Sequence, residues 1–419
     1  MTQLPTGWTR ARLGDVCTSV EKRDPSTIGR EHIKYVDIGS VDGGTQKLAP
    51  IEEIQAATAP TRARQVLVAG DTVFSTVRPY LKKIAFIDED LDGEFASTGF
   101  CVLRPSAQLH PKWLFYFATS NQLLDQVLPL QRGVSYPAVR DKDVLGSMIP
   151  VPPLEEQRRI VDILEDHLSR LDAAEHLLRV SHRRANLLQD ISIYSLLTGA
   201  GGSPTKLGDL VTHLRNGIFV SRAKPAGLGV PILRIGAVRP LRLDHCDVRS
   251  SERDEEELRR EDSLLLPGDL VFTRYNGNPA FVGACAVVGE GLGALTYPDK
   301  LIRVAVDRSR VLPDFLALAC SVGPGRAQIQ ERVKTTSGQA GISGRDLRTV
   351  QVSLPSLEVQ SSVVQAASRA IEAKWGLTRT LDVLLRRSDA LRRSLLAAAF
   401  DGRLSDRRDA LDHLEEVRA

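Results

Sequence analysis

The chain has 419 residues, of which 42% are hydrophobic and 26% are charged. At about 100–200 residues per domain, this length predicts about two to four domains, and the composition is ordinary for a soluble globular protein. No apolar run approaches the roughly 18 residues of a membrane helix, and Met1–Arg10 lacks the apolar core of a secretion signal. We therefore expect a cytoplasmic globular protein with no membrane partner.

Net charge and cysteine content limit the kinds of site. Lys and Arg number 55 against 52 Asp and Glu, a net charge of +3, so any nucleic-acid surface must be a local patch. The cysteines are odd in number and lack metal-ligand spacing, which favours reduced thiols over a disulfide framework or a zinc site. They are Cys17, Cys101, Cys246, Cys285 and Cys320.

Short motifs recur in the same order in both halves of the chain. Arg12–Val16 reads like Lys206–Leu210, and Val66–Phe74 reads like Leu264–Phe272. Three more pairs follow in register: Pro111–Leu114 with Pro313–Leu316, Pro153–Gln157 with Ser356–Gln360, and Leu197–Gly199 with Phe400–Gly402. This order indicates two copies of one unit of about 200 residues.

Each copy begins with short β-prone runs broken by Gly and Pro, such as Thr72–Val77 and Leu270–Thr273. Such runs predict a compact β-rich domain. Within it, a helix opened by proline is expected at Pro111–Leu124 and again at Pro313–Ser321.

A long helix is expected to close each copy. The first begins after Pro152–Pro153 and ends near Gly199, and the second ends at Gly402, because proline and glycine mark such boundaries. Apolar or small residues spaced by threes and fours predict a coiled-coil seam. The expected seam comprises Val161, Leu164, Leu168, Leu171, Ala174, Leu178, Ser181, Ala185 and Leu188, and then Val364, Ala367, Ile371, Lys374, Leu377, Leu381, Leu384, Ser388, Leu391, Leu395 and Ala398.

The obvious partner of each helix is the other one in the same chain, because one helix cannot bury its stripe alone. We expect an α+β fold: two similar β-rich domains joined by two long antiparallel helices in an intramolecular coiled coil with pseudo-two-fold symmetry. A parallel pairing of two chains is the rival arrangement. The expected boundaries are 1–150 and 201–350 for the β-rich domains, 151–200 and 351–402 for the helices of roughly 65 Å, and 403–419 for a charged tail.

Signals of catalysis are incomplete. Asn278–Phe281 approaches the motif with which adenine methyltransferases hold a base, and Gly289–Gly293 is similar to a nucleotide-binding turn. The two lie too close together to cap separate strands joined by a crossover helix. There is no phosphate-binding loop, and His245–Cys246 is an isolated pair. We therefore expect no catalytic residues and no metal site.

The start of the first long helix carries a distinctive block, Ile149–Val161, which contains Pro-Pro-Leu-Glu-Glu-Gln. Together with the tandem organisation, this block makes the chain resemble the specificity subunit of Type I restriction–modification enzymes. Four further segments share in the resemblance: Leu4–Trp8, Gly133–Val139, and the helix ends at Leu196–Gly199 and Phe400–Gly402. The resemblance extends to about Leu404. The second block, Leu354–Gln360, keeps one proline and loses one glutamate.

The resemblance implies a non-catalytic, sequence-specific DNA-binding subunit. Each β-rich domain would be a target recognition domain for one half of a bipartite, asymmetric site in double-stranded DNA. The helices would set the spacer and dock two methyltransferase (modification) subunits, which bring S-adenosylmethionine, so this chain binds no cofactor itself. Restriction subunits, which are ATP-dependent translocases and nucleases, are the optional further partner.

Candidate DNA contacts lie in three loops of each copy. Arg suits guanine edges, Asn suits adenine edges and Lys suits phosphates, whereas Gly permits close backbone approach. In the first copy they are Thr76, Arg78, Tyr80, Lys82, Lys83, Thr98, Arg132, Gly133, Ser135 and Tyr136. In the second copy they are Arg274, Tyr275, Asn276, Asn278, Tyr297, Lys300, Ser337 and Gln339.

Two other functions stay open at this point: a self-sufficient DNA adenine methyltransferase that uses Asn278–Phe281, and a scaffold that no longer reads DNA. The bases recognised are not readable from the sequence, because loop conformation decides which side chain meets which base edge.

Overall fold

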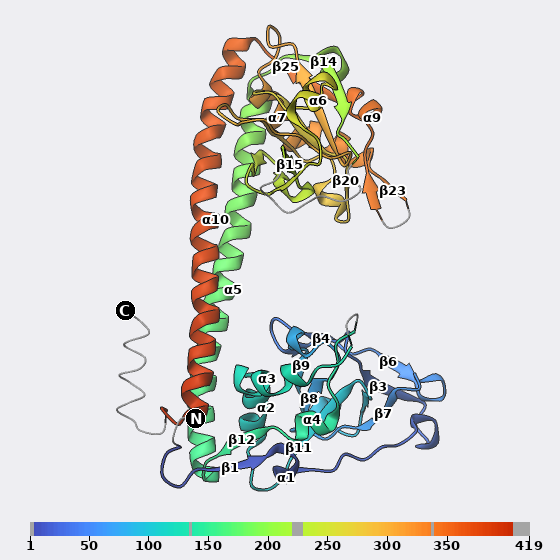
Figure 1. The fold of residues 1–419 in the computed structure, drawn as a ribbon, viewed down its shortest axis with the longest axis vertical. Coiled ribbons are helices and arrows are strands. Elements are labelled where there is room, and N and C mark those ends of the chain that lie inside the picture. Colours follow the sequence, from blue (N-terminus) through green and yellow to red (C-terminus); the bar gives the residue numbers. More distant parts are fainter. Residues whose placement is uncertain (1–3, 134–135, 220–228, 337–338, 405–419) are drawn as a thin grey trace. The chain divides into compact units, whose positions relative to one another are not determined.

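The computed structural model describes residues 4–133, 136–219, 229–336 and 339–404 (Figure 1). The chain divides into two compact units. Unit 1 comprises Met1–Leu178 and Asp382–Ala419, and unit 2 comprises Arg179–Leu381. Both long helices, α5 (Leu154–Gly199) and α10 (Leu357–Phe400), contribute residues to both units.

Unit 1 is built on a four-stranded antiparallel sheet in the order β2-β11-β8-β9. The helices α2 (Pro111–Thr119) and α3 (Asn121–Val127) bury Trp113 and Phe117 in one core with Phe74 of β8. A second sheet has the order β6-β3-β10-β7, and β1 pairs with β12. The strands are β1 Thr9–Arg12, β2 Cys17–Thr18, β3 His32–Val36, β4 Val41–Asp42, β5 Lys47–Leu48, β6 Glu53–Gln55, β7 Ala63–Val66, β8 Thr72–Ser75, β9 Ile84–Phe86, β10 Phe95–Ser97, β11 Phe100–Pro105 and β12 Met148–Val151; the short helices are α1 Leu13–Val16 and α4 Asp141–Leu145.

Unit 2 repeats the main sheet, the helix pair and the terminal strand pair of unit 1, but its remaining strands form the smaller sheets β15-β18, β16-β17 and β20-β24-β23. Its main sheet has the order β14-β22-β19-β21, and β13 pairs with β25 as β1 pairs with β12. The helices α7 (Pro313–Ser321) and α8 (Gly323–Glu331) take the place of α2 and α3. The strands are β13 Ser203–Lys206, β14 Val211–Asn216, β15 Pro231–Leu233, β16 Val238–Arg239, β17 Arg242–Leu243, β18 Val248–Ser250, β19 Leu270–Thr273, β20 Tyr275–Asn276, β21 Cys285–Val287, β22 Leu301–Val306, β23 Lys334–Thr336, β24 Gln339–Gly341 and β25 Gln351–Leu354; the short helices are α6 Glu255–Arg260 and α9 Gly344–Arg348. The expected internal repeat is thus present in the topology.

A Gly-Asp turn before the central strand has the same physical role in both units. Gly70 and Gly268 have φ of +94° and +84°, a backbone conformation that glycine adopts without strain. Asp71 then accepts two hydrogen bonds from Arg104, at 2.9 and 2.7 Å. Its counterpart Asp269 accepts one at 2.6 Å from Arg303. Each pair ties the central strand to its neighbour in the sheet.

The helices α5 and α10 lie side by side and run antiparallel within each unit (Figure 1). In unit 1, Ser388 donates a hydrogen bond to Glu175, and Arg392 donates one to Asp172. Residue numbers therefore decrease along α10 in the direction in which they increase along α5. In unit 2, His182 lies 3.1 Å from Thr378. The expected α+β fold with antiparallel helices paired inside one chain is confirmed, and the rival parallel pairing of two chains is not what the structure shows.

The register of the coiled-coil seam differs from the sequence-based prediction at several positions. On α5, Ala174, Ser181 and Leu188 are exposed, and the seam positions belong instead to Glu175, His182 and Gln189. On α10, Leu377 and Leu384 are exposed, and Thr378 and Leu385 take their places. The prediction followed apolar residues, whereas the seam steps by four and then three through positions that include polar residues, of which Glu175 and His182 form hydrogen bonds across it.

The expected helix at Pro111–Leu124 is interrupted. Ser120 is extended, with φ −72° and ψ 158°, so α2 ends at Thr119 and α3 begins at Asn121. The Ser120 hydroxyl donates a hydrogen bond of 2.7 Å to the carbonyl of Phe117. A short polar side chain that bonds its own backbone competes with the helix at this point.

No helix among the described residues is both long and apolar enough to span a bilayer.

Candidate nucleic-acid interface

In unit 1, backbone hydrogen bonds bring the three predicted DNA-contacting segments together. The Thr76 amide donates to the carbonyl of Gly99 (3.0 Å), and the Val139 amide donates to the carbonyl of Thr76 (2.9 Å). Two residues on, the Arg78 amide donates to the carbonyl of Pro137 (2.7 Å). Loops far apart in the sequence therefore form one surface beside the end of β8.

Arg78 is the centre of this surface. Its backbone has φ +48°, a conformation that is strained for any residue with a side chain. The guanidinium carbon lies 4.8 Å from the centroid of the Tyr136 ring, and 71% of Tyr136 is exposed. Tyr80, two residues further, is 49% exposed. The unit thus presents a stacked Arg–Tyr pair and a second tyrosine to solvent.

Thr76, Lys82 and Lys83 have structural partners inside unit 1. The Thr76 hydroxyl is buried and donates to the Gly99 carbonyl at 2.9 Å. The Lys83 ammonium donates to the carbonyls of Ile38 and Val41, both at 2.9 Å. Lys83 therefore secures the chain before β4, and Lys82 reaches toward a cavity instead of the Arg78 surface.

The remaining candidates of unit 1 are exposed. Thr98 and Arg132 lie on the surface. Gly133 has φ +90°, and a Cβ added at this position would lie 3.0 Å from the Tyr136 carbonyl oxygen. Ser135 lies outside the described residues. Contact of any of these residues with DNA stays a prediction.

In unit 2 the equivalent three segments also converge. The Arg274 amide donates to the carbonyl of Lys300 (2.8 Å), and the Ile342 amide donates to the carbonyl of Arg274 (3.0 Å). The strand β20 pairs with β24, with Tyr275 opposite Gly341. The two units therefore build a surface of the same kind at the same place in the fold.

Side-chain chemistry is similar in the two surfaces, but its details differ. The Arg274 guanidinium lies 4.7 Å from the centroid of the Tyr275 ring, and the Lys300 ammonium lies 5.8 Å from the same ring. Arg274 also donates to the carbonyl of Asp299 at 3.2 Å. Gln339 is exposed on β24, whereas Ser337 lies outside the described residues.

The two asparagines of unit 2 shape the loop. The Asn276 side chain accepts a hydrogen bond from the Asn278 amide (2.9 Å), and the Asn278 side chain accepts one from the Ala280 amide (3.0 Å). Asn278 is thereby the N-cap of a 3₁₀ turn, Pro279–Phe281. The capping bond gives the Asn-Pro pair a local structural role.

Tyr297 does not reach the surface. It is fully buried among apolar residues that include Val271 and Leu301, and burial raises the pKa of its hydroxyl to about 12. The structure therefore places Tyr297 in the core and not among the residues available to DNA. The sequence-based expectation was wrong here. It placed Tyr297 in an exposed loop because Pro-Asp-Lys follows it, but the tyrosine side chain packs into the core.

Phe219 is an interface candidate that the sequence analysis missed. It is 75% exposed, and the preceding Ile218 amide bonds the Tyr297 carbonyl at 3.0 Å. Gly217 permits this approach, since a Cβ there would lie 2.2 Å from the same oxygen. The Asp299 backbone amide donates back to the Ile218 carbonyl (2.8 Å), so Phe219 adjoins the segment that contacts Arg274. The signal in the sequence was the glycine before Ile-Phe at the end of a β-prone run.

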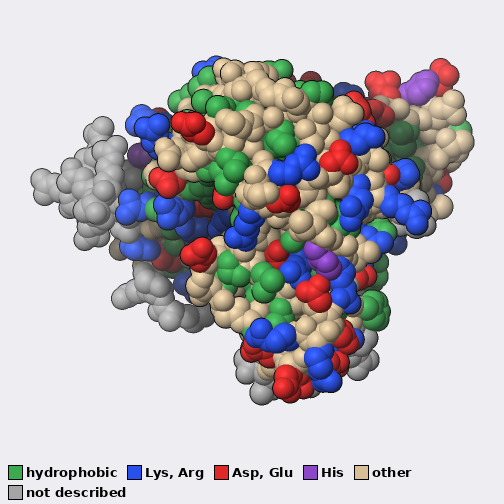
Figure 2. Space-filling view, turned by 90° about the horizontal axis from the view of Figure 1, so that it is seen from above, with side chains coloured by type: hydrophobic (Ala, Val, Ile, Leu, Met, Phe, Trp, Pro, Cys, Tyr) green, Lys and Arg blue, Asp and Glu red, His purple; other side chains and the backbone are tan. Residues whose placement is uncertain are grey.

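Surface charge is mixed. Figure 2 shows Lys and Arg side chains interspersed with Asp and Glu on the face in view. Within the described ranges, no cluster of three or more His, Cys, Asp or Glu residues could hold a metal ion. The interface candidates are thus local groups of Arg and aromatic residues.

Comparison with known proteins gives consistent results. The family model "Type I restriction modification DNA specificity domain" matches residues 5–179. The Type I restriction enzyme EcoKI specificity subunit of Escherichia coli (strain K12) is 31% identical over 332 residues, covering 76% of this chain and 71% of that protein. The StySPI specificity subunit of Salmonella potsdam is 25% identical over 332 residues, covering 73% and 68%.

A solved structure is similar along nearly the whole chain. It belongs to work on complex assembly and conformational transition of the type I R-M system, with 29% identity, a TM-score of 0.70, and 95% of this chain and 98% of that chain covered. All of these matches come from restriction–modification systems. The chain belongs to the family of Type I restriction enzyme specificity subunits.

Proposed function

We propose that each unit reads one half of a bipartite, asymmetric DNA site, unit 1 through the surface around Arg78 and unit 2 through the surface around Arg274. The observation that carries this proposal is the repeated convergence of three loops that present a stacked Arg–Tyr pair. Arginine forms paired hydrogen bonds with guanine, and an aromatic ring packs against bases or sugars. Because the two surfaces differ in detail, the two half-sites differ in sequence.

The helices α5 and α10 hold the spacing between half-sites and dock the modification subunits, two in number, that bring S-adenosylmethionine. Restriction subunits join in complexes that cleave. Exposed apolar side chains that the intramolecular seam leaves unused support protein docking, since such patches mark interaction sites. In unit 2 these are Leu187, Leu188 and Ile191 on α5, at 61, 64 and 53% exposure, and Leu377 on α10 at 42%.

The chain itself is non-catalytic in this proposal. The hydrogen bond from the Ala280 amide to Asn278 supports it, because this side-chain oxygen already caps a turn. Purified chain, DNA and labelled S-adenosylmethionine provide the test. We expect no methyl transfer until modification subunits are added; transfer by the chain alone would favour the self-sufficient methyltransferase.

Arg78→Ala and Arg274→Ala test the division of labour. Each variant should methylate DNA less well in the assembled enzyme. Each should also lose about 1–3 kcal/mol of discrimination at one base pair, and this loss should relax the sequence preference in one half-site only. Sequencing of methylated motifs provides the readout, and each variant is the control for the other. Equal relaxation of both halves by either variant would contradict the proposal.

A further inference from the structure

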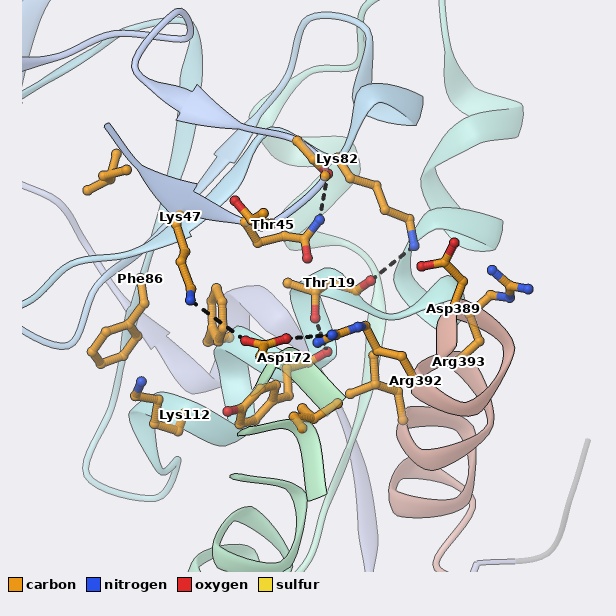
Figure 3. A pocket seen from close by; sticks show the side chains of 18 of the residues that line it. Thr45, Lys47, Lys82, Phe86, Lys112, Thr119, Asp172, Asp389, Arg392 and Arg393 are labelled. Carbon is orange, nitrogen blue, oxygen red and sulfur yellow. Dashed lines mark hydrogen bonds and ion pairs between the residues drawn. The ribbon is translucent and has the colours of Figure 1, made fainter. Parts of the chain in front are cut away.

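Unit 1 contains a cavity of about 640 Å³ next to its candidate interface. The segment Gly43–Leu48, α2, α5 and α10 surround it (Figure 3). Its basic lining residues are Lys47, Lys82, Lys112, Arg392 and Arg393, and its acidic ones are Asp88, Asp172 and Asp389. Basic residues therefore outnumber acidic ones five to three.

Three of the basic residues have carboxylate partners. Arg392 lies 2.6 Å and Lys47 3.7 Å from Asp172. Lys112 lies 3.5 Å from Glu165, just outside the lining. These pairs largely neutralise the side of the cavity formed by α2 and α5.

Lys82 and Arg393 lack such neutralisation. The Lys82 ammonium donates to the Thr119 carbonyl (3.3 Å) and the Asn121 side-chain oxygen (3.0 Å), both neutral groups. Within the described part of the chain, neither cation has an ion pair, although Asp389 lies near them in Figure 3. Burial and the charge of Arg393 lower the pKa of Lys82. Asp125 partly offsets this effect, so folding has placed two cations near each other with carboxylates in the vicinity, none of which among the described residues forms an ion pair with either.

The backbone at this place is also strained. Lys82 and Gln46, both in the lining, have φ of +48° and +54°. Such conformations cost free energy for residues with side chains and cluster at binding sites. Lys82 is held in this conformation while its side chain crosses from the domain toward α10 (Figure 3).

The cavity and the Arg78 surface share one short element. The 3₁₀ turn Pro79–Leu81 has Arg78 before it and Lys82 after it. The comparable region of unit 2 is a smaller cavity of about 220 Å³ that includes Asp314 and Glu372. Asp314 follows Pro313 as Lys112 follows Pro111, so the charge is reversed between the copies.

We propose that Lys82 and Arg393 form a phosphate-binding site for the DNA backbone flanking the half-site read by unit 1. This inference rests on the proposed function. Because the Pro79–Leu81 turn directly joins the site to the base-reading surface, a duplex held by Arg78 has phosphates within reach of it. Phosphodiester oxygens supply the close ion-pair partners that the two cations do not have among the described residues.

The test is DNA binding by the assembled modification complex as a function of salt concentration. Each lost phosphate contact lowers the slope of log affinity against log salt by about 0.9. We expect Lys82→Gln with Arg393→Gln to lower it by about 1.8 while leaving the methylated sequence motif unchanged. Arg170→Gln is the matched control, because Arg170 is two residues from both Leu168 and Asp172 and points to the opposite face of α5.

Neutral methylphosphonates in the DNA provide a measurement that does not alter the protein. Placed beside the half-site of unit 1, they should weaken wild-type binding and have little further effect on the double variant. An unchanged salt slope, or equal phosphonate effects on both proteins, would overturn the proposal. So would loss of modification-subunit binding with an unchanged slope, which would indicate a protein-docking site. Failure of the proposed function is distinct: no complex would then prefer its site over random DNA.

Discussion

Single buried polar side chains link each β-rich domain to its long helix. Gln157, at the start of α5, is fully buried; its oxygen accepts from the His110 amide (2.7 Å), and its nitrogen donates to the carbonyls of Gln108 and Pro152 (3.0 and 2.9 Å). Gln360 repeats this arrangement in unit 2, with Leu312, Arg310 and Pro355. The last residue of the Pro-Pro-Leu-Glu-Glu-Gln block is therefore a structural clamp.

Gln157→Leu removes all three hydrogen bonds and leaves backbone groups unpaired, the Pro152 carbonyl among them in a buried position. Since each such group costs about 1–3 kcal/mol, we expect a loss of about 2–4 kcal/mol in the free energy of unfolding of unit 1. Urea denaturation followed by hydrogen exchange provides the measurement. Gln360→Leu should do the same in unit 2, whereas exposed Gln365→Leu should not; equal small effects of all three would contradict the clamp.

Acid sensitivity of unit 2 follows from Asp346 in α9. The hydrogen bond from the Ser343 hydroxyl (2.6 Å) lowers the pKa of Asp346, and the backbone amide of Ser343 adds to the effect. A lowered pKa in the folded state means that this stabilisation is present above the unfolded value of about 3.9. It is lost as pH falls from that value through the folded pKa. The urea midpoint should therefore fall further between pH 7 and about pH 3, below the unfolded pKa, for the wild type than for Asp346→Asn; parallel losses would argue against this effect.

At the scale of elements, pattern and packing decided different things. Motif repetition and β-prone runs predicted two copies of a β-rich domain, and the sheets β2-β11-β8-β9 and β14-β22-β19-β21 bear this out. Periodicity also predicted both long helices. It could not fix their facing residues, because polar side chains such as Glu175 and His182 occupy the seam only when a partner across it, Ser388 or Thr378, completes their hydrogen bonds.

The corrected seam predicts unequal costs for two leucines in unit 2. Leu381 is 9% exposed and Leu188 is 64% exposed. Leu381→Ser should lower the free energy of unfolding by about 2–4 kcal/mol because it empties packed space. Leu188→Ser should change it by less than about 0.5 kcal/mol and should instead weaken capture of the modification subunit. Comparable destabilisation by both in urea unfolding would restore the seam expected from the sequence.

At the scale of the whole molecule, the proposed spacing function is tested by shortening both helices together. Deleting 181–187 from α5 and 374–380 from α10 removes one heptad from each helix. The seam is preserved, because residue 189 then stands four positions after residue 178, where residue 182 stood before. Seven residues correspond to about 10 Å of helix, or about three base pairs at 3.4 Å each.

We expect the methylated motif to keep both half-sites and to have a shorter spacer, or binding to be lost. Motif sequencing after expression with the modification subunit gives the answer. Deletion from α5 alone is the control, which should unfold the pair. An unchanged spacer with full activity would refute the idea that the helices set the spacing.

The sequence by itself determined the duplication, the two long helices and the family, because these depend on local order and periodicity that need no partner. It also named the three loops of each copy. Only the tertiary structure decided how individual side chains are used: Arg78 stacks on Tyr136, Tyr297 is buried, Phe219 is exposed, and Lys82 and Arg393 line one cavity. Burial and charge environment are properties of residues brought together from distant parts of the chain, and no local pattern contains them.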